Sequence, residues 1–592
     1  MPNKEEGKIE EYNKLQILAH KAEQAAELHL KNKLLNIYHE SATYKGKSSS
    51  EWDNFIQIIR KGSWPARRPA HRVNAVINFL VENIERKTAL LTDAKPIPKI
   101  TPRSQKFQDT ANITNQLMSI IFQSSQFGQV NADLVENAQV FGSSFIGTLF
   151  DKSLDNGRGD INITSFDPRA VYIDPLVLKS YLLCEGEYVI IEDIWPIEKA
   201  RDIFSKRADD IKPDMGLSAY SMTTPDGFLS RMKNAIVRYS KPEINTSEIP
   251  RVYVREFWIR DRSKNAQKQY KFKNASRKIV MVGDIIADDG DNPYNDGDFP
   301  IDMLIWHTDF NSGWGWGDAE LLRSPQELQN KIIATIIENI MLMSNAIWVG
   351  DTDALSKEEW IKLNNAPGTY VKKKPGRELR REAGVALPPH VIETVNYLER
   401  AGEKISGMVD VMQGIHTGQV SSGVGIESLQ LMAQALIRLR ARALEALQAR
   451  VGRKLMSRIF QFYGPDKIFE VLRSRQDDLT QESMRAYDSE LIKPIKSRKP
   501  TSWLDVIFEI EPGSSLGLAE TQRRIESMRL FELGVIDEVA LLADLKYPNR
   551  DKVILRMAKN RKDAPLTQEG ASAGSRGTQF PAQAGASPKG RF

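Results

Sequence analysis

The stretch GWGWGDAELLRSPQELQNKIIATIIENIMLMSNAIWVG, from Gly313 to Gly350, decides the fold of this 592-residue chain. Three glycines open it and predict a loosened backbone before a helix: Gly313, Gly315 and Gly317. Asp318 is a residue type that caps helix N-termini, and Pro325 fits only a first helical turn or a kink. The stretch therefore predicts a short Gly/Trp segment (residues 313–317) that leads into a long helix.

The helix expected over Leu328–Ile347 is more apolar than a helix with one wet face. Its apolar side chains cover more than the usual stripe of about 100°, so we expect it to contact neighbours on two sides, as copies packed around an axis do. Met341 is one of these apolar residues. The other six are also expected to mediate association: Ile332, Ile333, Ile336, Ile337, Ile340 and Met343.

Length and charge limit the classes of protein. A chain of 592 residues exceeds the roughly 250–300 residues at which one hydrophobic core stops growing, so two or more structural units are expected. Lys and Arg number 82 and Asp and Glu 77, a net charge of only +5. This balance argues against a protein that coats DNA through a dominant basic surface. It does not exclude contact with DNA along a channel, because a conduit in which DNA slides should avoid many simultaneous phosphate contacts.

Cysteine usage and hydropathy bear on the compartment. The single cysteine, Cys184, excludes an internal disulfide and a Cys-rich zinc site, and it is compatible with a reducing cytoplasm. The first residues lack the apolar core of a signal peptide. The segment Ile332–Gly350 is the one membrane-span candidate, but Glu338 and Asn339 lie in its middle, where a charge costs about 2.5–3.5 kcal/mol. We therefore expect no membrane insertion.

Helices and strands alternate along the N-terminal half, which predicts an α+β fold. Helical periodicity appears over about 8–40, over 73–92 and over Asp109–Phe141, and the prolines of KPIPKITP predict extended backbone after the second of these. SSFIGTLF alternates like a strand. Strands are also predicted in VYVREFWIR, QYKFK, RKIVMVGDIIAD and FPIDMLIW, between Val252 and Trp306.

Helices and short extended segments are also predicted in the second half of the chain. Short extended segments over about 346–382 precede a helix that begins near Val391, and a Gly/Ser-rich loop follows it. Ile426–Tyr463 is the longest uninterrupted helical pattern. A strand in WLDVIFEIEPG and two short helices come next, and the tail after Arg561 has a composition typical of disorder.

Residues that could perform catalysis are not arranged in a known pattern. The nearest string to a phosphate-binding loop, Gly46-Lys47-Ser48, lacks the first glycine, because position 41 is Ser41. No HExxH or GxSxG motif occurs, and the seven histidines lack zinc-ligand spacing. We predict no enzyme activity, no cofactor and no metal.

An acidic cluster leaves an alternative open. Five carboxylates lie between Asp288 and Asp298: Asp288, Asp289, Asp291, Asp296 and Asp298. They are interpreted as a solvated turn, with structural cation binding or a two-metal nuclease centre as the alternatives.

Three segments carry a resemblance to the portal proteins of tailed bacteriophages. FPIDMLIWHTDFNSGWGWGDAELLRSPQELQNKI (Phe299–Ile332) resembles the strand, link and stem helix of that family, including Gln326, Leu328, Gln329, Asn330 and Lys331. FDPRAVYIDP (Phe166–Pro175) and WLDVIFEIEPGSSLGLAETQRRIESMRLFELGVIDEVALL (Trp503–Leu542) resemble parts of its wing. The resemblance covers about residues 50–550, through element order rather than a catalytic motif.

The resemblance implies a portal-type architecture with an α/β wing, long stem helices, a small β-rich clip, a tunnel loop and a helical C-terminal region. The expected divisions are an N-terminal helix (1–49), wing (50–310), first stem helix (311–347), clip (348–390), second stem helix (391–413), tunnel loop (414–425), long helix with a possible crown (426–502), wing completion and C-terminal helices (503–560) and disordered tail (561–592).

The resemblance also implies roles for particular residues. Six basic residues lie in the expected clip: Lys372, Lys373, Lys374, Arg377, Arg380 and Arg381. They are expected to dock an acidic surface of a partner, with contact to DNA or a solvated hairpin as the alternatives. The tunnel loop is expected to touch DNA weakly, or else to be a plain linker, at His416, Thr417, Gln419, Ser421 and Ser422. Three roles are possible for four arginines of the following helix, namely contacts with DNA, contacts with a neighbouring subunit, or simple solvation. These arginines are Arg438, Arg442, Arg450 and Arg453.

The implied function is a ring, twelve-fold in the family, at one capsid vertex, through which double-stranded DNA enters and leaves. Its implied partners are the terminase motor, head-tail adaptor or tail proteins, and the major capsid and scaffolding proteins. Its location would be the virion and, during assembly, the host cytoplasm. Two alternatives are a metal-dependent DNA-processing nuclease built on the acidic cluster and a membrane-inserting DNA ejection protein built on Ile332–Gly350.

Overall fold

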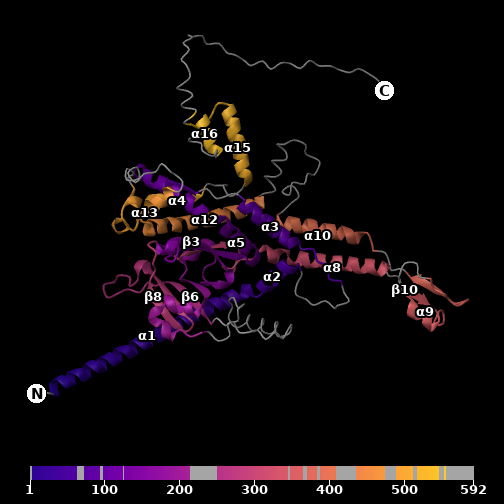
Figure 1. The fold of residues 1–592 in the computed structure, drawn as a ribbon, viewed down its shortest axis with the longest axis horizontal. Coiled ribbons are helices and arrows are strands. Elements are labelled where there is room, and N and C mark those ends of the chain that lie inside the picture. The colour runs from indigo at the N-terminus through magenta and orange to yellow at the C-terminus, as the bar shows by residue number, and fades with distance from the viewer. Residues whose placement is uncertain are drawn as a thin grey trace, which may run out of the picture. The chain divides into compact units, whose positions relative to one another are not determined.

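The computed structural model describes residues 3–62, 73–93, 98–124, 126–213, 250–344, 347–363, 370–382, 387–407, 435–473, 489–510, 517–545, 553–554 and 556. These residues mix helices and strands, in keeping with the α+β expectation (Figure 1). They fall into two compact units, Met1–Gly517 and Leu518–Phe592.

The helices of the first unit are α1 (Asn3–Ser49), α2 (Trp52–Lys61), α3 (Phe79–Thr92), α4 (Gln108–Ser124), α5 (Phe127–Phe141), α6 (Ile197–Ile203), α8 (Asp318–Ser344), α9 (Lys357–Lys362), α10 (His390–Ser406), α12 (Ala435–Phe462) and α13 (Pro465–Arg473). The strands are β1 (Pro98–Pro102), β2 (Ser143–Asp151), β3 (Asp160–Phe166), β4 (Val171–Ile173), β5 (Tyr188–Pro196), β6 (Arg251–Arg260), β7 (Ser276–Val282), β8 (Ile285–Asp291), β9 (Ile301–Ile305), β10 (Ile347–Gly350), β11 (Leu379–Glu382) and β12 (Val506–Ile510).

Four antiparallel sheets organise these strands. The largest has the order β4-β5-β6-β7-β8, and a second has the order β3-β2-β9. The pairs β1-β12 and β10-β11 form the other two. In β1-β12, Pro102 pairs with Val506 and Pro98 with Ile510, so a strand near residue 100 is completed by one near residue 508.

Helix α1 is anchored to the five-stranded sheet through its C-terminal half. Tyr38 is buried there, and its hydroxyl donates to Glu192 Oε2 at 3.0 Å, while Arg255 Nε lies 2.6 Å from the same carboxylate oxygen. Lys45 is also buried, and its ammonium donates to the backbone oxygens of Arg169 and Val171. Burial lowers the pKa of Lys45 to about 7, because the charged ammonium loses its hydration.

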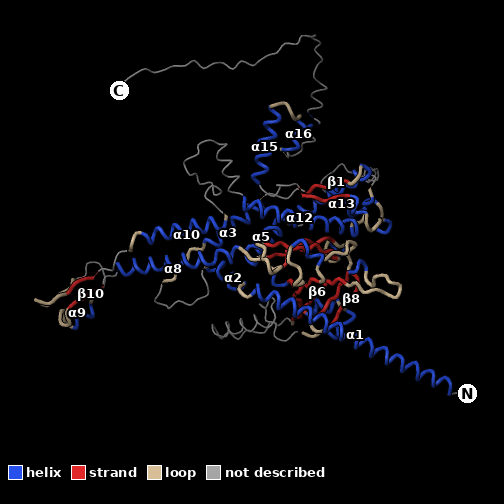
Figure 2. The backbone as a smooth tube through the Cα atoms, turned by 180° about the vertical axis from the view of Figure 1, so that it is seen from behind, coloured by secondary structure: helices blue, strands red, loops and turns tan. Residues whose placement is uncertain are grey.

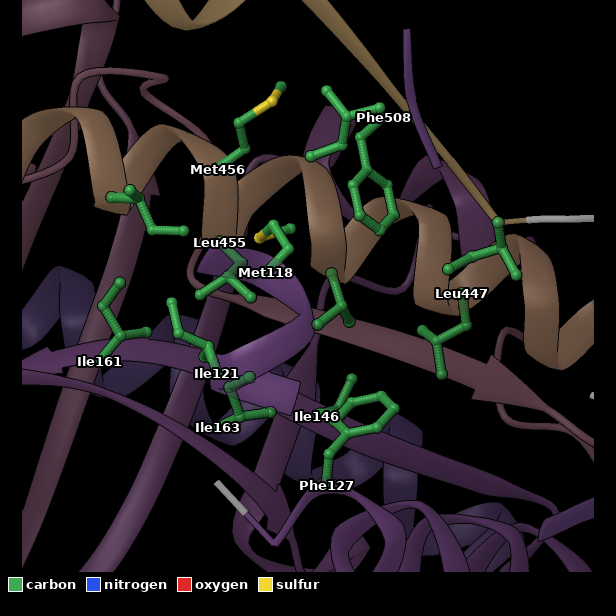
Figure 3. Close-up of a cluster of buried hydrophobic side chains, with 14 of the residues drawn as sticks. Met118, Ile121, Phe127, Ile146, Ile161, Ile163, Leu447, Leu455, Met456 and Phe508 are labelled. Atoms are coloured by element: carbon green, nitrogen blue, oxygen red, sulfur yellow. The ribbon is translucent and has the colours of Figure 1, made fainter. Parts of the chain in front are cut away.

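Helix α12 covers the three-stranded sheet and supplies one side of the largest hydrophobic core (Figure 3). Its apolar positions recur every three or four residues, and Leu447 and Leu455 are fully buried. Figure 3 shows them facing side chains of α4, α5, β2 and β3, with Phe508 of β12 on the other side of the helix. Arg498 caps the C-terminal end of α12, because its guanidinium donates to the carbonyls of Phe460 and Tyr463 at 3.0 and 2.7 Å.

Several predicted boundaries were wrong. The helical pattern Asp109–Phe141 is two helices, because Gln126 adopts a left-handed conformation (φ 51°) between α4 and α5. The helix predicted to run to Ile347 is described as far as Ser344, and Ile347 begins strand β10. The helix expected from residue 73 begins at Phe79, after Asn78 caps it with its side chain. QYKFK contributes only an isolated bridge between Lys264 and Tyr270.

The Gly/Trp segment is tightly packed rather than loosened. A Cβ on Gly313 would lie 1.9 Å from the carbonyl oxygen of Val177, and one on Gly317 would lie 2.2 Å from that of Gln139. Trp314, between them, is buried against Trp52, with the ring centroids 5.6 Å apart. These glycines therefore permit close backbone approach.

The second unit contains α15 (Gly517–Glu532) and α16 (Glu538–Asp544), which confirms the two short C-terminal helices.

Candidate functional site: the paired helices and the segment between them

The N-terminus of α8 is fixed by a buried polar network around Asp318. Its carboxylate lies 2.7 Å from Lys87 Nζ of α3 and 3.1 Å from His307 Nε2. Arg440 of α12 approaches His307 Nδ1 at 2.5 Å. Because a guanidinium only donates, Nδ1 accepts and the His307 proton resides on Nε2, which donates to Asp318. Burial opposes ionisation of Asp318, but the His307 hydrogen bond and the Lys87 charge hold its pKa below the ordinary value.

Two buried amides of α8, one turn apart, bind backbone groups at the end of α2, before α3 and in the first turn of α3. Gln326 donates to the carbonyl of Ile77 and accepts from the backbone N–H of Leu80 at 3.3 Å. Asn330 donates to the carbonyl of Gly62 at 2.6 Å and accepts from the N–H of Ile77 at 3.2 Å. We call Gln326 and Asn330 the amide clamp; it places α3 against α8.

The far half of α8 presents apolar side chains that this chain leaves partly or fully uncovered. Ile332, Ile333, Ile336 and Ile337 are half-buried. Ile340 and Met343 are exposed, as are Met341 and Leu342, and the exposed fractions of Ile340 and Leu342 are 51% and 64%. Helix α10 runs beside α8 (Figure 2) and covers part of this surface. Ile392 and Tyr397 of α10 are themselves exposed. The helix pair thus carries an apolar surface larger than one copy buries.

The segment between the two helices contains the antiparallel pair β10-β11 and the short helix α9 (Figure 1). The structure brings its six basic residues to exposed positions: Lys372, Lys373, Lys374, Arg377, Arg380 and Arg381. Arg377 lies 3.7 Å from Asp353, and Arg381 lies over the ring of Trp348. Trp360, Ile361 and Tyr370, which the sequence analysis did not single out, are exposed in the same segment.

The four arginines for which DNA contacts, subunit contacts or solvation were left open occupy different environments on α12. Arg442 is exposed and Arg438 is half-exposed. Arg450 donates to the carbonyl of Met303 at 3.0 Å, and Arg453 lies over the ring of Trp503 at 5.5 Å. The loop residues His416, Thr417, Gln419, Ser421 and Ser422 lie outside the described residues.

The acidic cluster is not one turn. Asp288, Asp289 and Asp291 belong to strand β8, which corrects the interpretation of all five carboxylates as a solvated turn. Arginines face three of the carboxylates: Arg277 lies 2.5 Å from Asp289, Arg260 lies 3.3 Å from Asp298, and Arg458 contacts Asp296. In the described residues no group of three or more His, Cys, Asp or Glu is placed to share a metal ion.

None of the helices in the described part of the chain combines the length and the apolar character that a membrane crossing needs.

Sequence reasoning missed several buried polar contacts of this region. One feature of the sequence pointed to the amide clamp, namely two polar residues four positions apart on an otherwise apolar helix face. Nothing in the sequence indicated that these amides bind backbone carbonyls of a distant segment. Arg458, fully buried against Asp296 and 3.9 Å from the ring centroid of Tyr294, resembled any other arginine of a solvated helix.

The chain matches one protein-family model over most of its length. The model describes Phage P22-like portal protein, and the match spans residues 64–587. No curated protein matches the chain significantly.

Proposed function

The chain belongs to the P22-like phage portal protein family, whose members are structural and not enzymatic, and on this premise we propose that its copies form a ring through which double-stranded DNA is packaged and ejected. Phage portal proteins sit at a capsid vertex in the virion. Twelve copies is the ring size that we propose, from the resemblance stated above.

The observation that carries the proposal is the uncovered apolar surface of the far half of α8. Each Å² of apolar side-chain surface that stays in water costs about 25 cal/mol. Ile340 and its exposed neighbours therefore favour association of a single copy with others. A head-to-tail ring uses two different faces of each subunit, which fits a helix that is apolar on more than one side. We assign α8 and α10 to the stem of the ring.

The remaining parts are assigned by the same reasoning. Residues 50–310 with 503–560 are proposed as the wing, and the pairing of β1 with β12 supports joining these two segments. A possible crown is placed within 426–502. The tunnel loop, 414–425, is proposed to touch passing DNA, with Arg438 and Arg442 as further candidates on α12.

The basic unit between α8 and α10 is proposed as the clip that docks the terminase motor and later the head-tail adaptor or tail proteins. Its exposed lysines and arginines favour a partner with an acidic surface, because complementary charge speeds and orients docking. Exposed Trp360 and Tyr370 would supply the apolar contacts that give such an interface affinity. Major capsid and scaffolding proteins are the proposed partners around the ring.

Light scattering and negative-stain imaging of the purified protein test the proposal together. A closed ring with a central opening wide enough for duplex DNA is expected. A lone copy at all protein concentrations, also in the presence of capsid and scaffolding proteins, would contradict it.

The two alternative functions were a DNA-processing nuclease and a membrane-inserting DNA ejection protein. A nuclease is not compatible with membership of a non-enzymatic family, and three carboxylates of its supposed centre face arginines. For the membrane-inserting protein, no observation among the described helices favours it.

A further inference from the structure

The loop between β6 and β7 concentrates positive charge. Its residues 262–273 read RSKNAQKQYKFK and include no carboxylate and five basic residues: Arg262, Lys264, Lys268, Lys271 and Lys273. The whole chain has 82 basic and 77 acidic residues, so without these five it holds 77 of each and has no net formal charge. The positive excess at this loop is therefore local and is not a share of a generally basic surface.

The loop is an ordered β-hairpin. Lys264 and Tyr270 pair across it as an antiparallel bridge. Beyond them, the backbone N–H of Asn265 donates to the carbonyl of Gln269 at 2.8 Å. The side-chain oxygen of Asn265 closes the tip, because it accepts from the N–H groups of Gln267 and Gln269, both at 3.0 Å. The backbone is thus fixed before a partner arrives, so binding costs little conformational entropy in the loop.

The five basic side chains are all exposed, and most of their charge is not compensated. Arg262 pairs with Glu187 at 2.7 Å, and within the described residues it is the one member of the five that forms an ion pair. Lys264 lies over the ring of Tyr270, with Nζ 5.5 Å from the ring centroid. Four ammonium groups therefore repel one another within residues 264–273 until an anion binds among them.

The other side chains of the hairpin indicate which anion it fits. Nucleic-acid phosphates are bound by Arg, Lys, Ser, Asn, Gln and Tyr side chains. Every residue from Arg262 to Lys271 except Ala266 is one of these types. A protein partner would instead need an apolar centre. Tyr270, 51% exposed, is the one large apolar side chain that this hairpin exposes, so the composition favours a phosphate polymer over an acidic protein surface.

We propose that the β6–β7 hairpin binds the phosphate backbone of duplex DNA without sequence preference, as a site separate from the tunnel loop and the arginines of α12. The major groove of B-form DNA is about 12 Å wide and admits a two-stranded β-ribbon, which is the shape of this hairpin. The inference rests on the proposed function in one respect, that duplex DNA is the polymer that this protein meets. Figures 1 and 2 both show β6 well apart from β10 and α9, so the hairpin acts independently of the segment between α8 and α10.

Neutralising the hairpin tests the proposal in the full chain. Three lysines are changed together: Lys264→Gln, Lys268→Gln and Lys271→Gln. Binding to a fluorescent duplex of about 20 base pairs should weaken about tenfold at low salt and depend less on salt, because each lost phosphate contact removes about 0.9 from the slope of log K against log salt. The matched control carries the same change at three exposed lysines of α1 and should bind like wild type: Lys21, Lys33 and Lys47.

A second measurement locates the contact and needs no variant. Wild-type protein is acetylated on its lysines with and without the duplex, and mass spectrometry measures the extent at each position. The duplex should protect the hairpin lysines severalfold and should leave the three α1 lysines unprotected. Polyglutamate at the same concentration of negative charge replaces the duplex in a third sample, because it presents the carboxylates of an acidic protein without phosphate.

Three outcomes would overturn the inference. They are hairpin lysines that acetylate equally with and without the duplex, a hairpin variant that binds no more weakly than the α1 variant, and equal protection by polyglutamate, which would assign the hairpin to an acidic protein instead. Light scattering on the same samples separates this result from the proposed ring. A ring whose hairpin is unprotected leaves the ring standing, whereas a lone copy with a protected hairpin supports the DNA site and contradicts the ring.

Discussion

Gly452, in the middle of α12, lies directly against the ring of Phe508 in β12. A Cβ on Gly452 would come 2.0 Å from Phe508 Cε1, far inside the contact distance of two non-bonded carbon atoms. The glycine lets strand β12 approach the helix that covers the main core.

Replacing Gly452 by alanine should therefore destabilise the protein although alanine is the better helix former. Overpacking costs about 1–3 kcal/mol, which exceeds the gain of about 1 kcal/mol in helix propensity. Thermal unfolding should show a lower transition temperature, and adding Phe508→Leu should restore part of it. Gly46→Ala is the control, because nothing lies within 4 Å of a Cβ at Gly46 in α1. Stabilisation by Gly452→Ala would contradict the packing described.

Lys45→Met should change how stability depends on pH. The folded pKa of Lys45 is about 7 and its ordinary value is 10.5, so between these values the unfolded chain holds a proton that the folded chain lacks. Wild-type stability then rises with pH by up to about 1.4 kcal/mol per unit in this window, and the variant lacks this rise. Its advantage should be largest below pH 7 and should shrink towards pH 10.

Denaturant unfolding at pH 6, 8 and 9.5 measures the effect of Lys45→Met. The control is Lys47→Met, an exposed lysine of the same helix, which should keep the wild-type pH slope. Equal slopes for Lys45→Met and wild type would show that Lys45 is charged in the folded protein at every pH tested.

Asn330→Leu should break the amide clamp. The carbonyl of Gly62 and the N–H of Ile77 lose their partner, at a cost of about 2–4 kcal/mol in unfolding free energy. Denaturant unfolding measures this cost. The control Asn112→Leu, at an exposed amide of α4, should change stability by less than about 0.5 kcal/mol. A similar small change for Asn330→Leu would mean that other groups satisfy Gly62 and Ile77.

Ile340→Asp should prevent ring formation and leave the fold of a single copy intact. The side chain is half exposed in one copy, so the carboxylate stays hydrated until a neighbour covers it, and burying it there costs several kcal/mol. Light scattering should give a smaller mass than wild type. Leu176→Asp, at an 82% exposed leucine outside α8 and α10, is the control and should assemble normally. An unchanged mass for Ile340→Asp would exclude this surface from the interface.

Reversing the charge of Lys372, Lys373 and Lys374 to Glu should abolish docking of the terminase motor without changing the mass of the ring. Docking of wild type should weaken with salt, because exposed charges are screened over about 10 Å at 0.1 M. Co-sedimentation at two salt concentrations measures both effects. The same change at Lys264, Lys268 and Lys271, exposed lysines of one loop, should leave docking intact. Equal loss in both triple variants would mean that net charge, not the clip, governs docking.

Local periodicity was enough to predict most helices and strands, including α8, α10, α12 and β12. It failed where an apolar pattern continues through a backbone break, as at Gln126 between α4 and α5. For the proposed site, residue type was enough to predict that the far half of α8 is apolar and that the six basic residues between α8 and α10 are exposed, and the roles proposed for them stay predictions. The amide clamp and the contact between Gly452 and Phe508 join residues far apart in the chain, and no local pattern encodes such partners.

The pairing of β1 with β12 has a consequence for biosynthesis. A ribosome adds about 5–20 residues per second, and the partners Pro102 and Val506 are separated by about 400 positions. The edge of β1 must therefore wait roughly 20–80 s for its partner to emerge from the exit tunnel. During that time nascent chains on one polysome expose the same unpaired strand, so chaperone protection of this edge would set how much protein reaches assembly.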